Sequence, residues 1–233
     1  MCAAVARKEI TLSQDRVGDS NLAASLEEMN AMQVDILKEI ANIGAGHASS
    51  ALSMMLEMRV EQQIPEVSLV RLEDMTDLLG GAERPVVGVG IVVSGDIAGY
   101  LLMLLDIGQA EKVVQAIRGQ PAETNEYGEP FSMLDRSALQ ETLNIMAGSY
   151  LTALSEMTGL MGIPSTPDLA LDMLGSVLSQ PIAAAGESSD YVLYFRSGLF
   201  SSLSDDIGTF SGDLLLVPDK ESYTTLLKSL GCE

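Results

Sequence analysis

An internal repeat is the feature that most constrains how this chain of 233 residues can fold. A shift of 102 residues superposes two apolar segments, "EIANIGAGHASSALS" from Glu39 and "ETLNIMAGSYLTALS" from Glu141. Identical residues then coincide, among them Glu39 and Glu141, Asn42 and Asn144, Gly46 and Gly148, Ala51 and Ala153, Leu52 and Leu154, and Ser53 and Ser155. A repeat at a fixed offset predicts two structurally equivalent halves.

Each half is expected to contain the same order of elements. A long helix, about 33–58 and about 131–159, precedes a strand, a short helix, two adjacent apolar strands and a closing amphipathic helix. The later segments coincide only at an offset of 113, so the second half has about 11 additional residues, most of them expected near "SSLSDD". The sequence therefore predicts an α/β fold, a pseudo-twofold α/β sandwich of two α-β-α-β-β-α repeats that share a six-stranded sheet.

The two repeats, 31–120 and 130–233, are expected to form a single domain joined by the linker "GQPAETNEYGEP". Residues 1–30 lack sustained periodicity and are expected to be a flexible tail. The most membrane-like stretch, 86–105, contains Asp96 in a Ser-Gly-Asp turn signal, so we interpret it as two buried strands. We expect no membrane insertion and a cytoplasmic location.

Composition excludes several classes of function. The formal net charge is −20 and no basic cluster is present, which argues against binding to nucleic acid or to an anionic membrane surface. Cys2 and Cys232 lie at the two ends and His47 is the single histidine, so we expect neither a disulfide framework nor a metal site. The segment "GAGHAS" lacks the lysine of a phosphate-binding loop.

A polar stripe follows each long helix. At about 100° per residue, the following residues share one face: Asp35, Glu39, Asn42, Gly46, Ser49 and Ser53 in the first helix, and Ser137, Glu141, Asn144, Gly148 and Ser155 in the second. Each helix is expected to expose this face and to bury an apolar stripe that lies roughly opposite. The apolar stripes are Leu37, Ala41, Ala48 and Leu52 in the first helix, and Leu139, Leu143, Tyr150 and Leu154 in the second. A single Glu-x-x-Asn is common on solvated helix faces. Its repetition with the same small neighbours favours a common function.

These residues carry a family resemblance. The pattern Asp/Ser-x3-Glu-x2-Asn-x22-Pro occurs twice without a gap, as Asp35, Glu39, Asn42 and Pro65, and as Ser137, Glu141, Asn144 and Pro167. It resembles the CheC-type chemotaxis phosphatases, a family that includes CheX and FliY. The flanks "NIGAGHASSALS" and "AGSYLTALSEMTG" are more similar to the CheC type than to the shorter one-site relative. The resemblance covers about residues 30–233.

The resemblance implies a function and a second partner. The function is hydrolysis of the aspartyl phosphate of the response regulator CheY, and the second partner is the receptor deamidase CheD. In each site the Asn is expected to position the attacking water and the Glu to dock the regulator. Asp35 and Ser137 are expected to orient the Glu or the helix start, and Pro65 and Pro167 to shape the exit into the first strand. No cofactor or metal of its own is expected, because Mg²⁺ would belong to the regulator.

Two other functions are compatible with parts of the sequence. A non-catalytic chemotaxis or flagellar-switch protein would keep the Glu and Asn pairs as docking contacts for CheY, CheD or both. An unrelated enzyme acting on a small molecule would need a cluster of bases, nucleophiles or metal ligands, and the sequence shows none.

Overall fold

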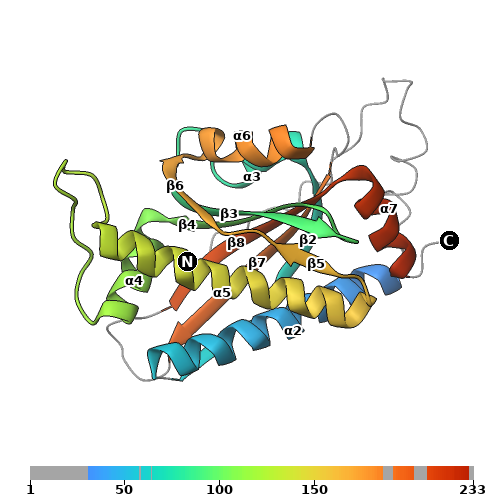
Figure 1. Cartoon of the computed structure of the whole chain (residues 1–233), viewed down its shortest axis with the longest axis horizontal. Coiled ribbons are helices and arrows are strands. Elements are labelled where there is room, and N and C mark those ends of the chain that lie inside the picture. Colours follow the sequence, from blue (N-terminus) through green and yellow to red (C-terminus); the bar gives the residue numbers. More distant parts are fainter. Residues whose placement is uncertain (1–30, 58, 64, 186–190, 202–208, 231–233) are drawn as a thin grey trace, which may run out of the picture.

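The fold, seen in a computed structural model that describes residues 31–57, 59–63, 65–185, 191–201 and 209–230, is a single sheet with helices on both faces (Figure 1). Eight strands form it among the described residues: β1 (Val60–Gln62), β2 (Glu66–Arg71), β3 (Pro85–Gly95), β4 (Gly99–Asp106), β5 (Gly162–Pro164), β6 (Asp168–Met173), β7 (Tyr191–Ser201) and β8 (Thr209–Pro218). All pairs are antiparallel. The expected α/β sandwich is confirmed. The predicted count of six strands omitted β1 and β5, which have only three residues each.

Six α-helices accompany the sheet in the described residues, in agreement with the expected order. They are α2 (Ala31–Leu56), α3 (Met75–Leu78, preceded by the 3-10 turn η1, Leu72–Asp74), α4 (Ile107–Arg118), α5 (Met133–Thr158), α6 (Leu174–Ala185) and α7 (Lys220–Ser229). The predicted ends of the long helices were wrong by one or two residues. At α5, Ser132 caps the N-terminus, and Gly159 ends the helix in a left-handed conformation (φ 71°).

The strand registers show the twofold relation directly. Leu102 on β4 faces Leu215 on β8, and these two residues are equivalent at the offset of 113, so the pseudo-twofold axis passes between them. The pair Val67–Phe195 of β2 and β7 has its equivalent in Leu169–Val89 of β6 and β3. The offset between β3 and β7 is 106 residues, so four of the 11 additional residues precede β7 and seven lie between β7 and β8.

The two halves exchange their first strands. β2 from the first half pairs with β7 of the second half, and β6 from the second half pairs with β3 of the first. The resulting order is β2–β7–β8–β4–β3–β6, with β1 and β5 extending the outer positions on β7 and β3. Neither half therefore completes a sheet alone.

Apolar side chains fill the space on both faces of the sheet. On one face, α2, α5, α4 and α7 cover the larger cluster, to which α2 contributes Leu37, Ala41, Ala48 and Leu52, and α5 contributes Leu139, Leu143, Tyr150 and Leu154. These eight residues form the predicted apolar stripes. On the opposite face, η1, α3 and α6 cover a smaller cluster.

The apolar stretch 86–105 forms strands β3 and β4, which lie side by side and are joined at Asp96–Ala98. The interpretation of this stretch as two strands is confirmed. Among the described residues, no helix is long and apolar enough to cross a membrane. The expected tail, residues 1–30, lies outside the described residues.

The close approach of α2 and α5 depends on Gly44. An added Cβ at Gly44 would lie 3.0 Å from the Tyr150 Cα and 2.8 Å from its Cδ1. We predict that Gly44→Ala lowers the free energy of unfolding by about 1–3 kcal/mol, because the helices must separate or Tyr150 must shift. Gly148→Ala is the control, because an added Cβ there meets nothing within 4 Å. Urea unfolding of both variants checks the prediction, and a Gly44→Ala variant as stable as the control would contradict it.

Candidate functional site

The two long helices place the two Glu and Asn pairs on the surface of the α2 and α5 layer. The helices run antiparallel against each other, α2 from right to left and α5 from left to right in Figure 1. Glu39 and Glu141 are exposed, while Asn42 and Asn144 are half-buried. Exposure of the two polar stripes was predicted, and the structure confirms it for both carboxylates.

The side chains of both pairs are free to meet a partner. Within the described residues, no hydrogen bond or ion pair commits the side chain of Glu39, Asn42, Glu141 or Asn144. An unpaired carboxylate beside an unpaired carboxamide offers one anionic acceptor and a group that both donates and accepts hydrogen bonds. Each pair can therefore bind a cationic side chain and a water molecule at neighbouring points.

The two pairs lie well apart. Gly44 meets Tyr150, and the twofold places the equivalent contact between Ala48 and Met146, so the helices cross near Gly46 and its counterpart. Glu39 and Glu141 each lie seven residues before the crossing, in opposite directions. A rise of 1.5 Å per residue separates them by roughly 20 Å along the helices. One phosphoryl group can therefore reach one pair at a time.

Asp35 and Ser137 precede the two Glu residues by one turn, but their hydrogen bonds go elsewhere. The Asp35 carboxylate pairs with Lys38 at 3.4 Å, and both side chains are exposed. The Ser137 hydroxyl donates to the Met133 carbonyl at 3.0 Å within the first turn of α5. Among the described contacts, neither side chain forms a hydrogen bond with its Glu, so the expected orientation of the Glu by Asp35 or Ser137 has no hydrogen bond to support it.

Pro65 and Pro167 lie immediately before β2 and β6, where the chain leaves the helix layer and enters the sheet. Pro65 is buried, and the Pro167 carbonyl accepts a hydrogen bond from the Gln140 side chain at 2.6 Å. Gln140 directly precedes Glu141 in α5. The proline of the second half is thus tied to the helix turn that carries the second pair.

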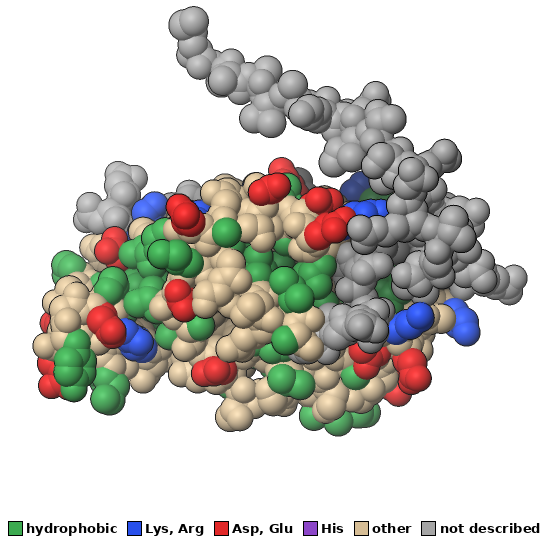
Figure 2. Space-filling model, turned by 90° about the horizontal axis from the view of Figure 1, so that it is seen from above, with side chains coloured by type: hydrophobic (Ala, Val, Ile, Leu, Met, Phe, Trp, Pro, Cys, Tyr) green, Lys and Arg blue, Asp and Glu red, His purple; other side chains and the backbone are tan. Residues whose placement is uncertain are grey.

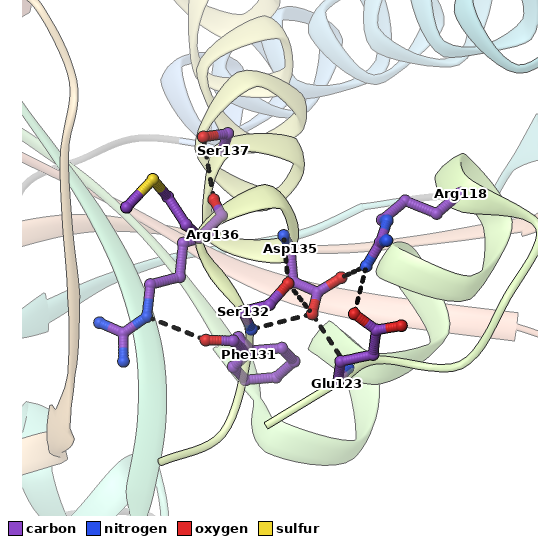
Figure 3. A network of polar contacts seen from close by, with 8 residues as sticks. Arg118, Glu123, Phe131, Ser132, Asp135, Arg136 and Ser137 are labelled. Carbon is purple, nitrogen blue, oxygen red and sulfur yellow. Dashed lines mark hydrogen bonds and ion pairs between the residues drawn. The ribbon is translucent and has the colours of Figure 1, made fainter. Parts of the chain in front are cut away.

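A buried carboxylate anchors the start of α5, and sequence reasoning missed it (Figure 3). Asp135 is completely buried and forms an ion pair with Arg118 at the end of α4. The same carboxylate accepts hydrogen bonds from the Glu123 N–H at 3.0 Å and from the N–H and hydroxyl of Ser132 at 2.9 and 2.8 Å. With the Ser132 cap this forms a capping box, whose Ser-x-x-Asp spacing was the available signal in the sequence.

These contacts lower the pKa of Asp135. Burial alone raises it, but the Glu123 N–H, the Arg118 guanidinium and the two groups of Ser132 outweigh burial and bring the pKa to about 2. The unfolded chain has an Asp pKa of about 3.9. Because the folded pKa is the lower one, the network stabilises the fold fully above about pH 4, and this contribution disappears as the pH falls toward 2.

We predict that the free energy of unfolding loses about 2 kcal/mol from this single group between pH 5 and pH 2. Other carboxylates also titrate in that range, so Asp135→Asn is the reference. The difference in stability between the wild type and Asp135→Asn should shrink by that amount as the pH falls. Urea unfolding at several pH values checks it, and a difference that is independent of pH would show that Asp135 does not titrate with a lowered pKa.

Neither the surface charge nor the possible metal ligands point to a further site in the described residues. Carboxylates are scattered over the face that α6 and α3 cover, with few lysine or arginine side chains between them (Figure 2). No group of three or more His, Cys, Asp or Glu side chains in the described residues is placed to hold a metal ion. His47 is half-buried in α2, where it lines a groove beside α5.

Comparison with known protein families finds the same repeat in this chain. The model of the CheC-like family matches residues 32–68 and 134–170, two stretches that are themselves 102 residues apart. The CheY-P phosphatase CheC of Bacillus subtilis (strain 168) is 32% identical over 85% of this chain and 94% of its own length. A putative CheY-P phosphatase, CheC1 of Halobacterium salinarum, is 26% identical over 85% of this chain and 96% of its own.

Solved structures share the fold at lower identity. The X-ray crystal structure of Thermotoga maritima FliY superposes with a TM-score of 0.66, at 20% identity, over 87% of this chain and 99% of that one. The middle domain of a Vibrio FliM gives a TM-score of 0.59 at 16% identity, over 83% of this chain and 99% of that one. These two likenesses establish the fold, and the 32% identity to a full-length relative establishes the family. The chain belongs to the CheC-like family.

Proposed function

We propose that this protein is a phosphatase that hydrolyses the aspartyl phosphate of a CheY-type response regulator at two sites, Glu39 with Asn42 and Glu141 with Asn144. The observation that carries the proposal is the equivalence of the two pairs. Both lie on exposed helix faces at twofold-related positions, and neither is committed to another described residue. Relatives that match most of the chain are named CheY-P phosphatases.

The chemistry requires little of the catalyst. An aspartyl phosphate is an activated acyl phosphate, so a catalyst needs to place a water molecule in line with the phosphorus and to stabilise the charge. The Asn42 or Asn144 carboxamide can accept from and donate to that water without bringing a negative charge close to the phosphate. Mg²⁺ would be held by the regulator's own carboxylates, where it neutralises the developing charge.

The carboxylates have a different role in this proposal. Glu39 or Glu141 would pair with a lysine at the regulator's active site and fix the register of the two proteins. The helix face beyond each Asn carries only small side chains for one turn, so the regulator can approach α2 or α5 closely. Water positioning and docking would then depend on two side chains one turn apart.

The direct test mixes the protein with a phosphorylated response regulator and follows the loss of the phosphoryl group. We expect a rate that rises with protein concentration and exceeds the intrinsic rate of the regulator. An aspartyl phosphate that decays at its intrinsic rate would reject the enzyme and favour a non-catalytic binding protein, provided that the two proteins still associate.

The receptor deamidase CheD is the second partner that the resemblance implies, and we extend the proposal to it on that ground alone. Co-purification of CheD with this protein, with and without the phosphorylated regulator, tests the extension. The cytoplasmic location expected from the sequence is part of the same proposal, because a cytoplasmic regulator would be the substrate.

A further inference from the structure

The two Glu and Asn pairs have different surroundings, although the repeat makes the pairs themselves equivalent. Beside the second pair lies a groove with a volume of about 540 Å³. Its lining includes His47 of α2, Gly148, Leu151 and Thr152 of α5, and Gly162 and Pro164 of β5. Its floor is apolar, with Leu151 packed against Gly162, where a Cβ would lie 2.7 Å from Leu151 Cδ1.

The corresponding place at the first pair is covered. The counterpart of Pro164 is Gln62 on β1, and the carboxamide atoms of Gln62 lie 3.7 and 3.9 Å from the position of an added Cβ on Gly46. At Gly148 no atom lies within 4 Å of that position. The Ser53 hydroxyl also accepts from the Val60 N–H at 2.9 Å, which closes the gap between α2 and β1 with polar groups.

We propose that the groove receives an apolar side chain of the response regulator. Gln62 occupies the corresponding place beside the first pair, so a regulator bound there lacks this contact. The inference rests on the proposed function, because the occupant is the regulator whose phosphoryl group meets Asn144. The two sites then differ in how tightly they hold the same regulator, while the chemistry at Asn42 and Asn144 is the same.

Continuity of the surface identifies the occupant. Gly148 lies one turn beyond Asn144 on the same face of α5, a rise of about 6 Å. A specific protein interface covers roughly 800 Å² on each partner and is therefore roughly 30 Å across. A regulator that presents a phosphoryl group to Asn144 must also cover the groove. An apolar hollow left under that interface would lose dispersion contacts, so a side chain of the regulator that fills it strengthens binding.

Steady-state kinetics in single-site backgrounds test the inference. Asn42→Ala leaves only the second pair intact, and Thr152→Phe then fills the groove from its exposed rim. We expect KM to rise about tenfold or more, with kcat changed by less than about twofold, because binding surface is lost while the water-positioning group remains. The matched control is Ser50→Phe, since Ser50 is the exposed twofold counterpart of Thr152 and does not line the groove.

The reciprocal background tests the role of Gln62. Asn144→Ala leaves only the first pair intact, and Gln62→Ala should then lower KM by about threefold or more, because the surface beside Gly46 opens. An unchanged KM for Thr152→Phe in the Asn42→Ala background, an equal rise for Ser50→Phe, or a loss confined to kcat would overturn the inference.

Binding measurements separate this inference from the proposed function. If the wild type does not dephosphorylate the regulator, the proposed function is wrong, whatever the groove does. A titration of the phosphorylated regulator against the wild type, Thr152→Phe and Ser50→Phe then decides the groove by itself. Weaker binding for Thr152→Phe alone supports it, whereas equal binding by all three proteins, or no binding by any, rejects it.

Discussion

Replacement of both Asn42 and Asn144 by Ala is expected to lower the rate of regulator dephosphorylation by roughly 10²–10³-fold, the usual cost of removing one positioning or electrostatic contact from a reaction centre. Each single replacement should retain part of the activity, because the other half still carries a complete pair. The measurement is the dephosphorylation rate against protein concentration for the wild type, both single variants and the double variant. A double variant as fast as the wild type would reduce the repeated pair to a solvated helix face.

The Glu positions provide the matched comparison for this experiment. Glu39→Ala combined with Glu141→Ala should weaken binding of the phosphorylated regulator by about 1.5–3 kcal/mol, because a charge-assisted contact is lost. The double Asn variant should keep most of its binding. Both double variants should stay within about 0.5 kcal/mol of the wild-type stability per position, since the side chains have no partner in the described fold. If both double variants lose binding equally, the separate roles are wrong.

Replacement of Arg118 by Met is expected to lower the free energy of unfolding by about 3–5 kcal/mol, because it leaves the Asp135 carboxylate buried without its cation. Methionine keeps an apolar stem of similar length, so the loss reports mainly the charge. That amount is a large part of the 5–15 kcal/mol that typically holds a domain folded. Urea unfolding at pH 7 measures it.

An exposed ion pair is the control for Arg118. Arg59 lies 2.8 Å from Glu61 with 74% of its side chain exposed, and Arg59→Met should cost no more than about 1 kcal/mol. A second variant, Arg118→Lys, retains the positive charge and should recover part of the lost stability. Exposed ion pairs typically contribute up to about 1 kcal/mol, which sets the threshold. If Arg118→Met stays within about 1 kcal/mol of the wild-type stability, the neighbouring N–H groups are enough to stabilise the buried Asp135 carboxylate.

The repeat made much of the fold predictable from the sequence. Because Glu39 and Glu141 coincide at one offset, each uncertain element in one half could be checked against its counterpart in the other. The apolar stripe of α2 was predicted from period alone, and its members Leu37 and Leu52 are buried as expected. The turn at Asp96 between β3 and β4 was predicted from the Ser-Gly-Asp sequence, which is recognisable even within a long apolar stretch.

Pairing between the halves was not predictable in the same way. β3 and β7 are both apolar over most of their length, so the residue pattern does not tell whether β2 pairs with one or the other. β1 and β5 have three residues each, too few for an alternation of period two to be recognised. Three-dimensional packing decides these pairings. It places β1 and β2 beside β7, and β5 and β6 beside β3, and each of these partners belongs to the hairpin of the other half.

The surroundings of the two pairs were also beyond the sequence. Gln62 and Pro164 are equivalent at the shift of 102, but their difference has no meaning until β1 and β5 are seen beside α2 and α5. Asp135 has no acidic counterpart, since Gln33 occupies the equivalent position. A comparison that searches for identical residues in the two halves does not find Asp135. A search for helix starts could have found it, because Ser132 and Asp135 have the spacing of a capping box.

The exchange of β2 and β6 between the halves affects how the nascent chain folds during synthesis on the ribosome. When residues up to about Arg118 have emerged, β3 and β4 can form their hairpin, but the outer edge of β3 must wait for β6 and that of β4 for β8. β2 has no neighbour until β7 is synthesised. The nascent first half therefore carries unpaired, apolar strand edges, which are prone to association with other chains. Completion of the sheet is therefore a late event that requires both halves of the chain.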